Sequence, residues 1–371
     1  MKIDKNTWPA LELLKAISIA CMIVLHSWGM VITEEDFNVY KGSWFLIFGN
    51  ILHFGCFFDI WIPAIAGATL NLQLLKQNYS SPTRLSVVKN SSYWGFILLL
   101  SGWVFEIFLR NPYPFLSFNP LHFMGGSFLI VTVLLAISKN NDLTLWTLVF
   151  FIVALFKDSI TSLFPYVFPE TYEELFRHGA LEVTKFYLAQ ITFGISSQGW
   201  SLIPWFSIVL IGFSYSNYYS KNILTPKTLK AMIFISLFIV LFFLAFKSSR
   251  NFIQSQTLLD QYSALNMPIP LFISCASGFI FILSALTYFQ KKLTFVHQPF
   301  PNAFSRGSFW IFFLHFPLGN VLSSLFESYS FGVRWIGFPI FMLAWCFLIG
   351  LIILELGKKK INIKLLKLTP S

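Results

Sequence analysis

Two histidines, His26 and His53, lie in apolar segments of the sequence that are long enough to cross a lipid bilayer. An ionisable side chain at membrane depth is costly, so it is by default a candidate functional group. Histidine is also the side chain best suited to proton transfer near neutral pH. The two rings therefore predict an active site embedded in a membrane.

The two histidines are predicted to lie at the same, outer level of the membrane. At about 1.5 Å per residue, His26 lies about 25 Å above the inner start of the first span, and His53 lies about nine residues below the outer start of the second. Two further spans begin at this level with polar or aromatic residues, namely His122, Gln198 and Trp205. Four spans would thus meet at a cavity that opens outward.

Each of these residues also has a simpler explanation. A lone histidine inside a membrane often forms a hydrogen bond between helices. Histidine and tryptophan near the ends of spans also act as interface anchors. Both alternatives stay open, most evenly for His122.

Asn50 and Asp59 flank His53 in the second predicted span. Asn50 lies three residues before His53, on the same helix face, so it can orient the ring or bind an acceptor. Asp59 lies deeper and needs a partner or a proton. Because six residues separate it from His53, the two do not share a face, and a direct dyad is not expected.

At the inner end of the first span, Glu12 and Lys15 have the i,i+3 spacing of an ion pair. Together with the inner-loop residues Arg84 and Arg306, they would suit a phosphate-rich cytosolic ligand. Basic residues accumulate in cytoplasmic loops without any ligand, so this signal has a second explanation. His315 is expected about eight residues above the inner side of its span, separate from the outer cluster.

Composition identifies the class of protein. Of the 371 residues, 56% are hydrophobic and only 11% are charged, whereas soluble domains carry about 25% charged residues. Apolar stretches of about 20 residues recur along the chain, as a bilayer requires, and their continuity excludes a β-barrel. We expect an all-α bundle forming one integral-membrane domain over 1–371, with no soluble domain and no cleavable signal peptide.

The apolar pattern predicts ten spans, with a short or re-entrant helix at 181–195 as a candidate eleventh. The spans are 9–31, 44–72, 93–110, 119–137, 143–165, 199–217, 230–246, 268–289, 307–327 and 335–356. With the N-terminus inside, inner segments hold eighteen of the 26 Lys and Arg residues and outer segments the other eight. The positive-inside rule therefore predicts that both termini are cytoplasmic, and it accounts for the formal charge of +10 without nucleic acid. The four cysteines (Cys21, Cys56, Cys275, Cys346) fall in apolar runs, so we expect free thiols and no metal site.

Several short motifs resemble those of transmembrane acyltransferases. Residues 10–16 (ALELLKA), followed by His26, are similar to the family's opening, Leu-Asp-x-x-Arg-Gly and then His or Asn. The heparan-α-glucosaminide N-acetyltransferase-like branch is the closer match, and the acyltransferase-3 family, through Lys15 and His26, is the second. The segments that resemble the first branch are 59–67 (DIWIPAIAG), 121–125 (LHFMG), 202–206 (LIPWF) with Gly212, 305–308 (SRGS) and 314–317 (LHFP). Glu12, Lys15 and Ala16 depart from the family's Asp, Arg and Gly.

The resemblance implies transfer of an acetyl or other acyl group from cytosolic acetyl-CoA to a sugar amine or hydroxyl on the far side of the membrane. Acetyl-CoA would be a co-substrate, no cofactor would be tightly bound, and the acceptor would be a glycan or sugar. We expect a protein of the bacterial cytoplasmic (inner) membrane, in contact with lipid but not with nucleic acid; a homodimer is left open.

On this hypothesis His53 removes the acceptor's proton and His26 hydrogen-bonds the developing oxyanion, with an acyl-histidine route also open. Asn50 is the third catalytic candidate. Substrate binding is assigned to Asp59, His122, Trp205 and Gln198, and binding of the CoA donor to Glu12, Lys15, Arg84 and Arg306. A solute transporter with the same cavity, or an inactive family member that acts as an assembly partner, are the alternatives.

Overall fold

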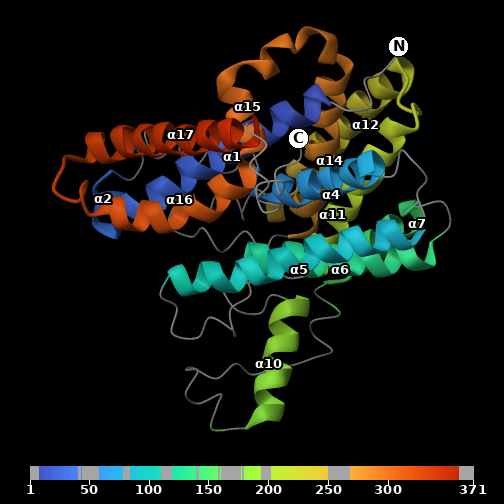
Figure 1. Ribbon diagram of the computed structural model, residues 1–371, viewed down its shortest axis with the longest axis horizontal. Coiled ribbons are helices and arrows are strands. Elements are labelled where there is room, and N and C mark those ends of the chain that lie inside the picture. The colour runs from blue at the N-terminus through green and yellow to red at the C-terminus, as the bar shows by residue number, and fades with distance from the viewer. Residues whose placement is uncertain are drawn as a thin grey trace. The chain divides into compact units, whose positions relative to one another are not determined.

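The computed structural model describes residues 8–40, 43, 58–77, 84–109, 119–138, 142–157, 159, 177, 179–193, 202–249 and 268–358. Within these ranges every regular element is a helix, as the sequence predicts (Figure 1). The chain divides into two compact units, the first comprising residues 1–65, 222–261 and 270–371, and the second 66–221 and 262–269. The prediction of a single domain over 1–371 stays a prediction.

Helix α1 (Pro9–Val31) forms the centre of the first unit. Its apolar run begins with proline at the first helical turn, where the missing N–H costs nothing. It packs against α15 (Pro299–Arg306), α16 (Ser308–Ser323) and α17 (Phe338–Lys358). The unit also contains α2 (Glu34–Val39), α12 (Pro226–Leu244), nearly all of α14 (Ile269–Tyr288), the 3-10 turns η3 (Gln290–Lys292) and η4 (Thr294–His297), and the π-helical turn η5 (Val333–Gly337).

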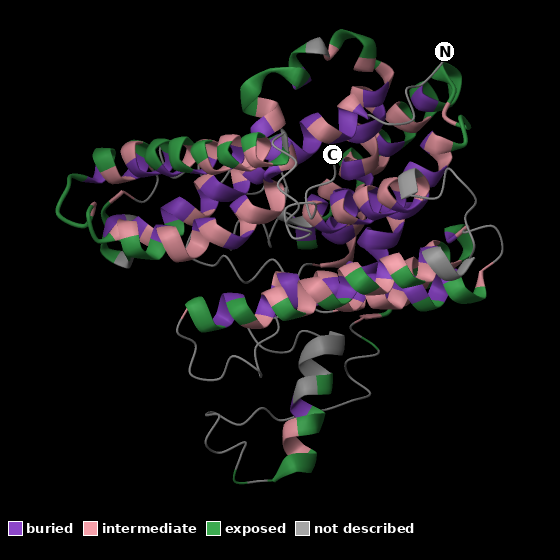
Figure 2. Ribbon diagram, in the orientation of Figure 1, coloured by how far each residue is buried: buried purple, intermediate pink, exposed green. Residues whose placement is uncertain are grey.

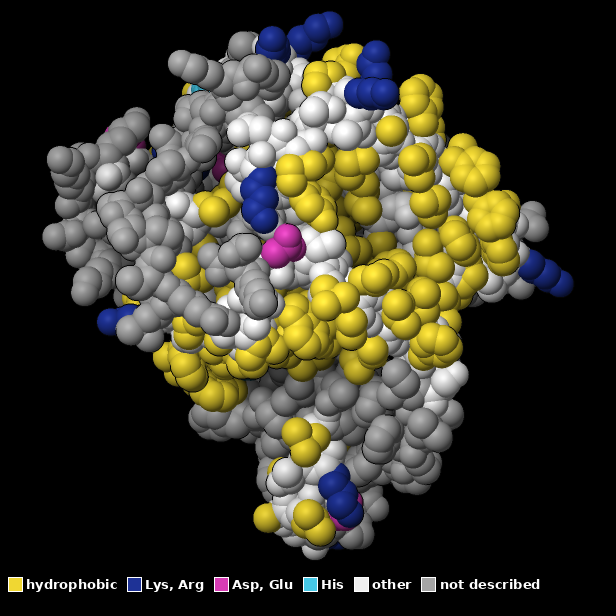
Figure 3. Space-filling view, turned by 90° about the vertical axis from the view of Figure 1, so that its right-hand side faces the viewer, with side chains coloured by type: hydrophobic (Ala, Val, Ile, Leu, Met, Phe, Trp, Pro, Cys, Tyr) yellow, Lys and Arg dark blue, Asp and Glu magenta, His cyan; other side chains and the backbone are white. Residues whose placement is uncertain are grey.

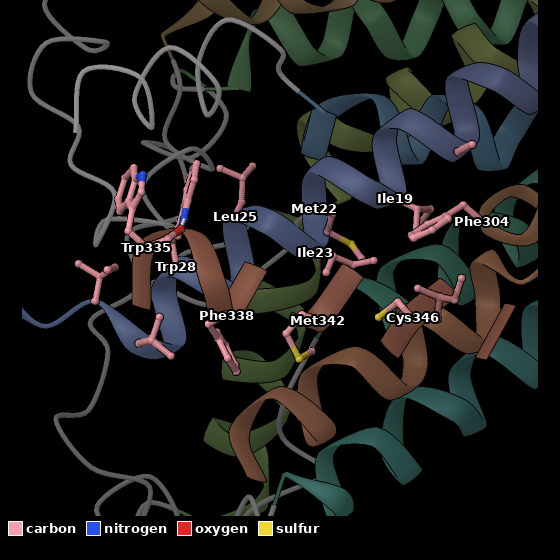
Figure 4. Close-up of a cluster of buried hydrophobic side chains, with 14 of the residues drawn as sticks. Ile19, Met22, Ile23, Leu25, Trp28, Phe304, Trp335, Phe338, Met342 and Cys346 are labelled. Carbon is pink, nitrogen blue, oxygen red and sulfur yellow. Dashed lines mark hydrogen bonds between the residues drawn. The ribbon is translucent and has the colours of Figure 1, made fainter. Parts of the chain in front are cut away.

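A core of apolar side chains joins α1, α15, α16, η5 and α17, as Figure 4 shows for the labelled residues. At one end of α1, the Trp28 ring stacks on that of Trp335 with 4.3 Å between centroids, and its Nε1 donates a 2.8 Å hydrogen bond to the Trp335 carbonyl. Toward the other end, α15 and α17 approach closely because both carry small residues. A Cβ added at Gly350 would lie 2.7 Å from the carbonyl oxygen of Ala303.

The second unit contains most of α4 (Phe58–Gln77), together with α5 (Arg84–Phe108), α6 (Pro120–Ile137), α7 (Thr144–Leu155), α10 (Ala180–Phe193) and α11 (Leu202–Ser220). Helix α5 runs along α6, and α7 runs along α11. Asn71 Nδ2 on α4 donates a 2.8 Å hydrogen bond to Ser216 Oγ on α11. Glycine at position 67 permits this approach, since an added Cβ would overlap the carbonyl of Val209.

Each of the ten predicted spans contains a described helix, and α10 lies at the predicted short helix. Helix α5 begins at Arg84, nine residues before the predicted start of the third span, so the depth at which that span enters the membrane stays a prediction. Residues 44–57, the first half of the second predicted span, lie outside the described residues. Among the described residues, six helices are long and apolar enough to cross a membrane, so the count of ten spans stays a prediction.

The described surface carries many large apolar side chains, including Phe96 on α5, Phe234 and Phe238 on α12, and Trp345 on α17. Figure 2 shows exposed residues along the outer sides of these helices, and Figure 3 shows that hydrophobic side chains cover much of the described surface of one face. Lipid tolerates such surfaces, whereas water does not. We therefore treat the chain as a helical membrane protein.

Candidate functional site

The first unit brings together two histidines that are 289 residues apart in the sequence. His26 lies in the last third of α1, and His315 lies in the middle of α16. His26 Nδ1 and His315 Nε2 are 2.8 Å apart, and the ring planes are within 9° of parallel. We call these two residues the histidine pair.

The expectation that His315 lies apart from the outer cluster was therefore wrong. That expectation measured depth from residue 307, the start of the predicted span. In the structure, the helical segment begins at Pro299 with α15 and continues into α16 after Gly307. Counted from Pro299, His315 lies about 24 Å along the chain, close to the value of about 25 Å for His26 counted from Pro9.

The surrounding groups fix which nitrogens of the histidine pair carry protons. His315 Nδ1 lies 2.8 Å from the Phe312 carbonyl and 3.1 Å from that of Ile311. Because a carbonyl oxygen only accepts, this nitrogen must be the N–H donor. In the neutral ring, His315 Nε2 then holds a lone pair, and His26 Nδ1 must donate to it. When both rings are neutral, the lone pair of His26 therefore lies on its Nε2.

His315 is buried and His26 is half-buried, and aromatic rings contact both imidazoles. His315 is 2% exposed, and the Phe316 ring meets both imidazoles edge-on, with centroids 5.2 Å from His26 and 5.8 Å from His315. Because the partner His315 is buried, the hydrogen bond between the rings is electrostatically strengthened and orients the His26 ring. The pair can accept one proton at His26 Nε2 and spread the resulting charge over two rings and a backbone carbonyl.

Several predicted site residues cannot be placed against this pair. His53, Asn50 and Gln198 lie outside the described residues. For Asp59 and Arg84 the structure describes only the backbone, in the first turns of α4 and α5. Their predicted roles stay predictions.

His122, predicted to bind substrate, lies fully buried in the second unit. Its Nδ1 accepts a 3.3 Å hydrogen bond from the backbone N–H of Asn119, while the Asn119 side chain accepts from the backbone N–H of Leu121 and of His122. This reciprocal arrangement is a capping box at the start of α6. Asn119 Nδ2 also donates to Glu106 Oε1 at 2.7 Å, which ties α6 to α5. The capping box supports the structural explanation of His122, and the spacing Asn119-Pro120-x-His122 is the signal that could have revealed it. Its assignment to substrate binding stays a prediction.

Trp205, the other described residue assigned to substrate binding, is buried near the start of α11 at 1% exposure. Its ring lies among the packed side chains of the second unit. The assignment of Trp205 to substrate binding stays a prediction.

At the other end of α1, Ser305 Oγ on α15 donates a hydrogen bond to the Glu12 carboxylate. Lys15 is buried one turn further along α1, and Arg306 is half-buried beside Ser305. Three of the four residues assigned to the CoA donor thus lie on two helices that pack together. Binding of the donor there stays a prediction.

An ion pair that no local sequence pattern indicates joins α2 to η5. Arg334 Nη1 and Nη2 lie 2.5 Å from the two carboxylate oxygens of Asp36, and Nη1 also donates to the Val31 carbonyl at 2.8 Å. Burial alone raises the pKa of the Asp36 carboxyl, but hydrogen bonds from Arg334 and Thr33, with the Arg334 charge, outweigh it. The pKa of Asp36 is therefore below its ordinary value.

Comparison of the chain with models of known protein families finds no match, and comparison with curated proteins finds none either. The resemblance to transmembrane acyltransferases therefore depends on the short motifs quoted above. The histidine pair is the structural observation that can be weighed beside them.

Proposed function

We propose that this protein is a membrane-embedded acyltransferase that moves an acyl group from cytosolic acyl-CoA to an amine or hydroxyl acceptor on the opposite side. The observation that supports the proposal is the histidine pair, because His315 orients His26 as a proton acceptor among apolar helices. Such an arrangement is suited to removing a proton from a nucleophile near neutral pH.

In this proposal the acceptor's oxygen or nitrogen attacks the thioester carbonyl while its proton passes to His26 Nε2. The C–S bond then breaks, and the CoA sulfur leaves with that proton. While His26 is protonated, its Nδ1–H donates to His315, which in turn donates to the Phe312 carbonyl. A positioned base of this kind contributes about 10²–10⁴-fold to the rate.

This assignment changes the role first expected of His26. A neutral ring whose Nδ1 carries the proton has no N–H at Nε2 to offer an oxyanion. His26 is therefore better suited to act as a base than as an oxyanion donor. The same lone pair would serve an acyl-histidine route. His53 stays a second candidate for the base.

The charge distribution of the first unit supports the proposed orientation. Its described residues include nine Lys and Arg, of which seven lie toward the end where α1 begins: Lys15, Lys227, Lys230, Lys291, Lys292, Arg306 and Lys358. Trp8 Nε1 donates to Thr287 Oγ1 at 3.2 Å, which places the end of α14 beside the start of α1. By the positive-inside rule this end is cytoplasmic, and His26 lies toward the other side.

The experiment is single-turnover transfer from radiolabelled acetyl-CoA in purified, reconstituted protein. His26→Ala should lower the rate by about 10²–10⁴-fold, while its melting temperature in detergent stays close to that of the parent. The matched control is His297→Ala, because His297 is exposed on η4. Parent-like turnover in a folded His26→Ala protein would exclude the proposed base.

A proton-coupled transporter is the second candidate, and the broken helices of the first unit favour it. Helices α15 and α16 are interrupted at Gly307, and Pro317 lies inside α16. Interrupted helices commonly line transport sites. Acetyl-CoA separates the two candidates, since it should raise the melting temperature of an acyltransferase and leave that of a transporter unchanged.

A further inference from the structure

The basic end of the first unit carries a strip of exposed cations and aromatic rings contributed by two chain segments. The strip is formed by Lys230 at the start of α12, by Tyr288 at the end of α14, and by Phe289, Lys291, Lys292 and Phe295 in the segment that follows α14. We call these six residues the cationic strip.

Cation–ring contacts hold the strip together. Lys230 Nζ lies 5.6 Å from the centroid of the Tyr288 ring, and Lys292 Nζ lies 5.9 Å from that of Phe289. The Tyr288 and Phe289 rings meet edge to face with centroids 5.0 Å apart. Two lysines from separate segments are therefore fixed beside one aromatic pair, at distances where a cation is attracted to a ring face.

The charges of the strip lack a counterion within the described part of the protein. Lys230, Lys291 and Lys292 are exposed, and no described carboxylate lies within ion-pair distance of them. By contrast, the exposed Lys185 and Lys221 pair with Glu182 and Asp142. The strip therefore concentrates positive charge that an external anion can neutralise.

The aromatic rings indicate what kind of anion this is. Phe289 is 49% exposed and Phe295 is 42% exposed, on a segment that leaves the end of an apolar helix and turns through η3 and η4. The next helix, α15, buries Ala303, Phe304 and Ser305, while Phe300 in its first turn is 47% exposed. A segment with exposed lysines between exposed phenylalanines resembles the interfacial segments that lie at the headgroup level of a bilayer.

We propose that the cationic strip binds the headgroup of an anionic phospholipid, with the lysines at the phosphate and the exposed phenylalanines toward the acyl chains. A soluble phosphate compound would satisfy the lysines but would leave Phe289 and Phe295 in water. This inference does not depend on the chemistry of the histidine pair.

Native mass spectrometry in a mild detergent tests the proposal by comparing bound phosphatidylglycerol with bound phosphatidylcholine. Phosphatidylglycerol should bind more tightly, and Lys230→Gln, Lys291→Gln and Lys292→Gln should each weaken its binding about fivefold. The matched control is Lys247→Gln, which removes an equally exposed lysine beyond the other end of α12. Phe295→Ser should weaken binding of both lipids.

Three results would overturn the inference. Equal binding of the two lipids would remove the preference for an anionic headgroup. An equal loss of phosphatidylglycerol binding in the Lys247→Gln control would mean that the lipid responds to the net charge of the protein and not to the cationic strip. Full displacement of phosphatidylglycerol by inorganic phosphate or acetyl-CoA at equal concentration would identify a site for soluble anions instead.

Discussion

His315 acts on His26 through a single hydrogen-bonding nitrogen, which makes its contribution measurable. His315→Leu removes the acceptor for the His26 Nδ1–H, whereas the side-chain oxygen of His315→Gln can replace it. Hydrogen bonds to charged groups contribute about 1.5–3 kcal/mol, so we expect the leucine variant to lose about 10–100-fold in the rate of acetyl transfer. The glutamine variant should recover part of that loss. Rates measured beside detergent melting curves check this, and equal losses in two stably folded variants would contradict the positioning role.

The individual site residues could be predicted only in part. His26 was recognisable because an ionisable group in an apolar span is rare. Its partnership with His315 was not, since the pairing of α1 with α16 is a tertiary contact that no local pattern encodes. His122 shows a different limit, because the local capping motif at Asn119 offers a structural explanation that depth alone did not, and its assignment to substrate binding stays a prediction.

At the scale of helices, the apolar pattern predicted which segments are helical better than it predicted where each helix begins and ends. The bounds of α1 matched because its apolar run starts at Pro9 and ends at Val31. Helix α5 extends nine residues of mostly polar sequence before the predicted span, and hydropathy reports only the apolar part of a helix. Helix α15 was missed because its eight residues are too few for a span, although it sets the depth of His315.

The contact of α15 with α17 predicts that Gly350 cannot be enlarged. A Cβ added at Gly350 would lie 2.7 Å from the Ala303 carbonyl oxygen. Because this oxygen belongs to the backbone, it cannot move aside as the end of a flexible side chain can. Gly350→Ala must therefore separate α15 from α17. Overpacking of this kind costs about 1–3 kcal/mol. Gly357→Ala on the same helix is the control, because its Cβ meets nothing within 4 Å. Melting temperatures in detergent should fall for the first variant only, and a parent-like value for Gly350→Ala would contradict this packing.

The ion pair between α2 and η5 predicts an acid-sensitive contribution to stability. The pKa of Asp36 is lowered in the folded protein, so its stabilisation is complete above the ordinary value of 3.8 and is lost as pH falls below it. Asp36→Asn should therefore lower the melting temperature at neutral pH, while the gap from the parent closes as the pH falls below that value. Side-chain exposures of 13% for Arg334 and 11% for Asp36 suggest a loss of about 2 kcal/mol. If the difference in melting temperature between the parent and Asp36→Asn did not change with pH, the charge of the Asp36 carboxylate would not be what stabilises the contact between α2 and η5.

At the scale of the whole molecule, the predicted orientation depends on charge, and it stays a prediction. The eighteen-to-eight division of Lys and Arg predicted cytoplasmic termini. The first unit adds that helices far apart in sequence bring their basic ends together, as Lys230 beside Tyr288 illustrates. What the sequence could not provide is the division into two units, because this depends on which helices pack against which.

The orientation itself leads to a labelling experiment that needs no substrate. If the end where α1 begins is cytoplasmic, a cysteine at Lys291 should react with a membrane-impermeant maleimide only after intact cells are permeabilised. A cysteine at Lys247, beyond the far end of α12, should react before it. The native thiols of Cys275 and Cys346 are buried, so they should add little background, and the unsubstituted parent measures what remains. The reverse pattern would place the basic end outside. The histidine pair would then lie near the cytoplasmic face, on the same side as acyl-CoA, and acyl transfer across the membrane would lose its geometric support.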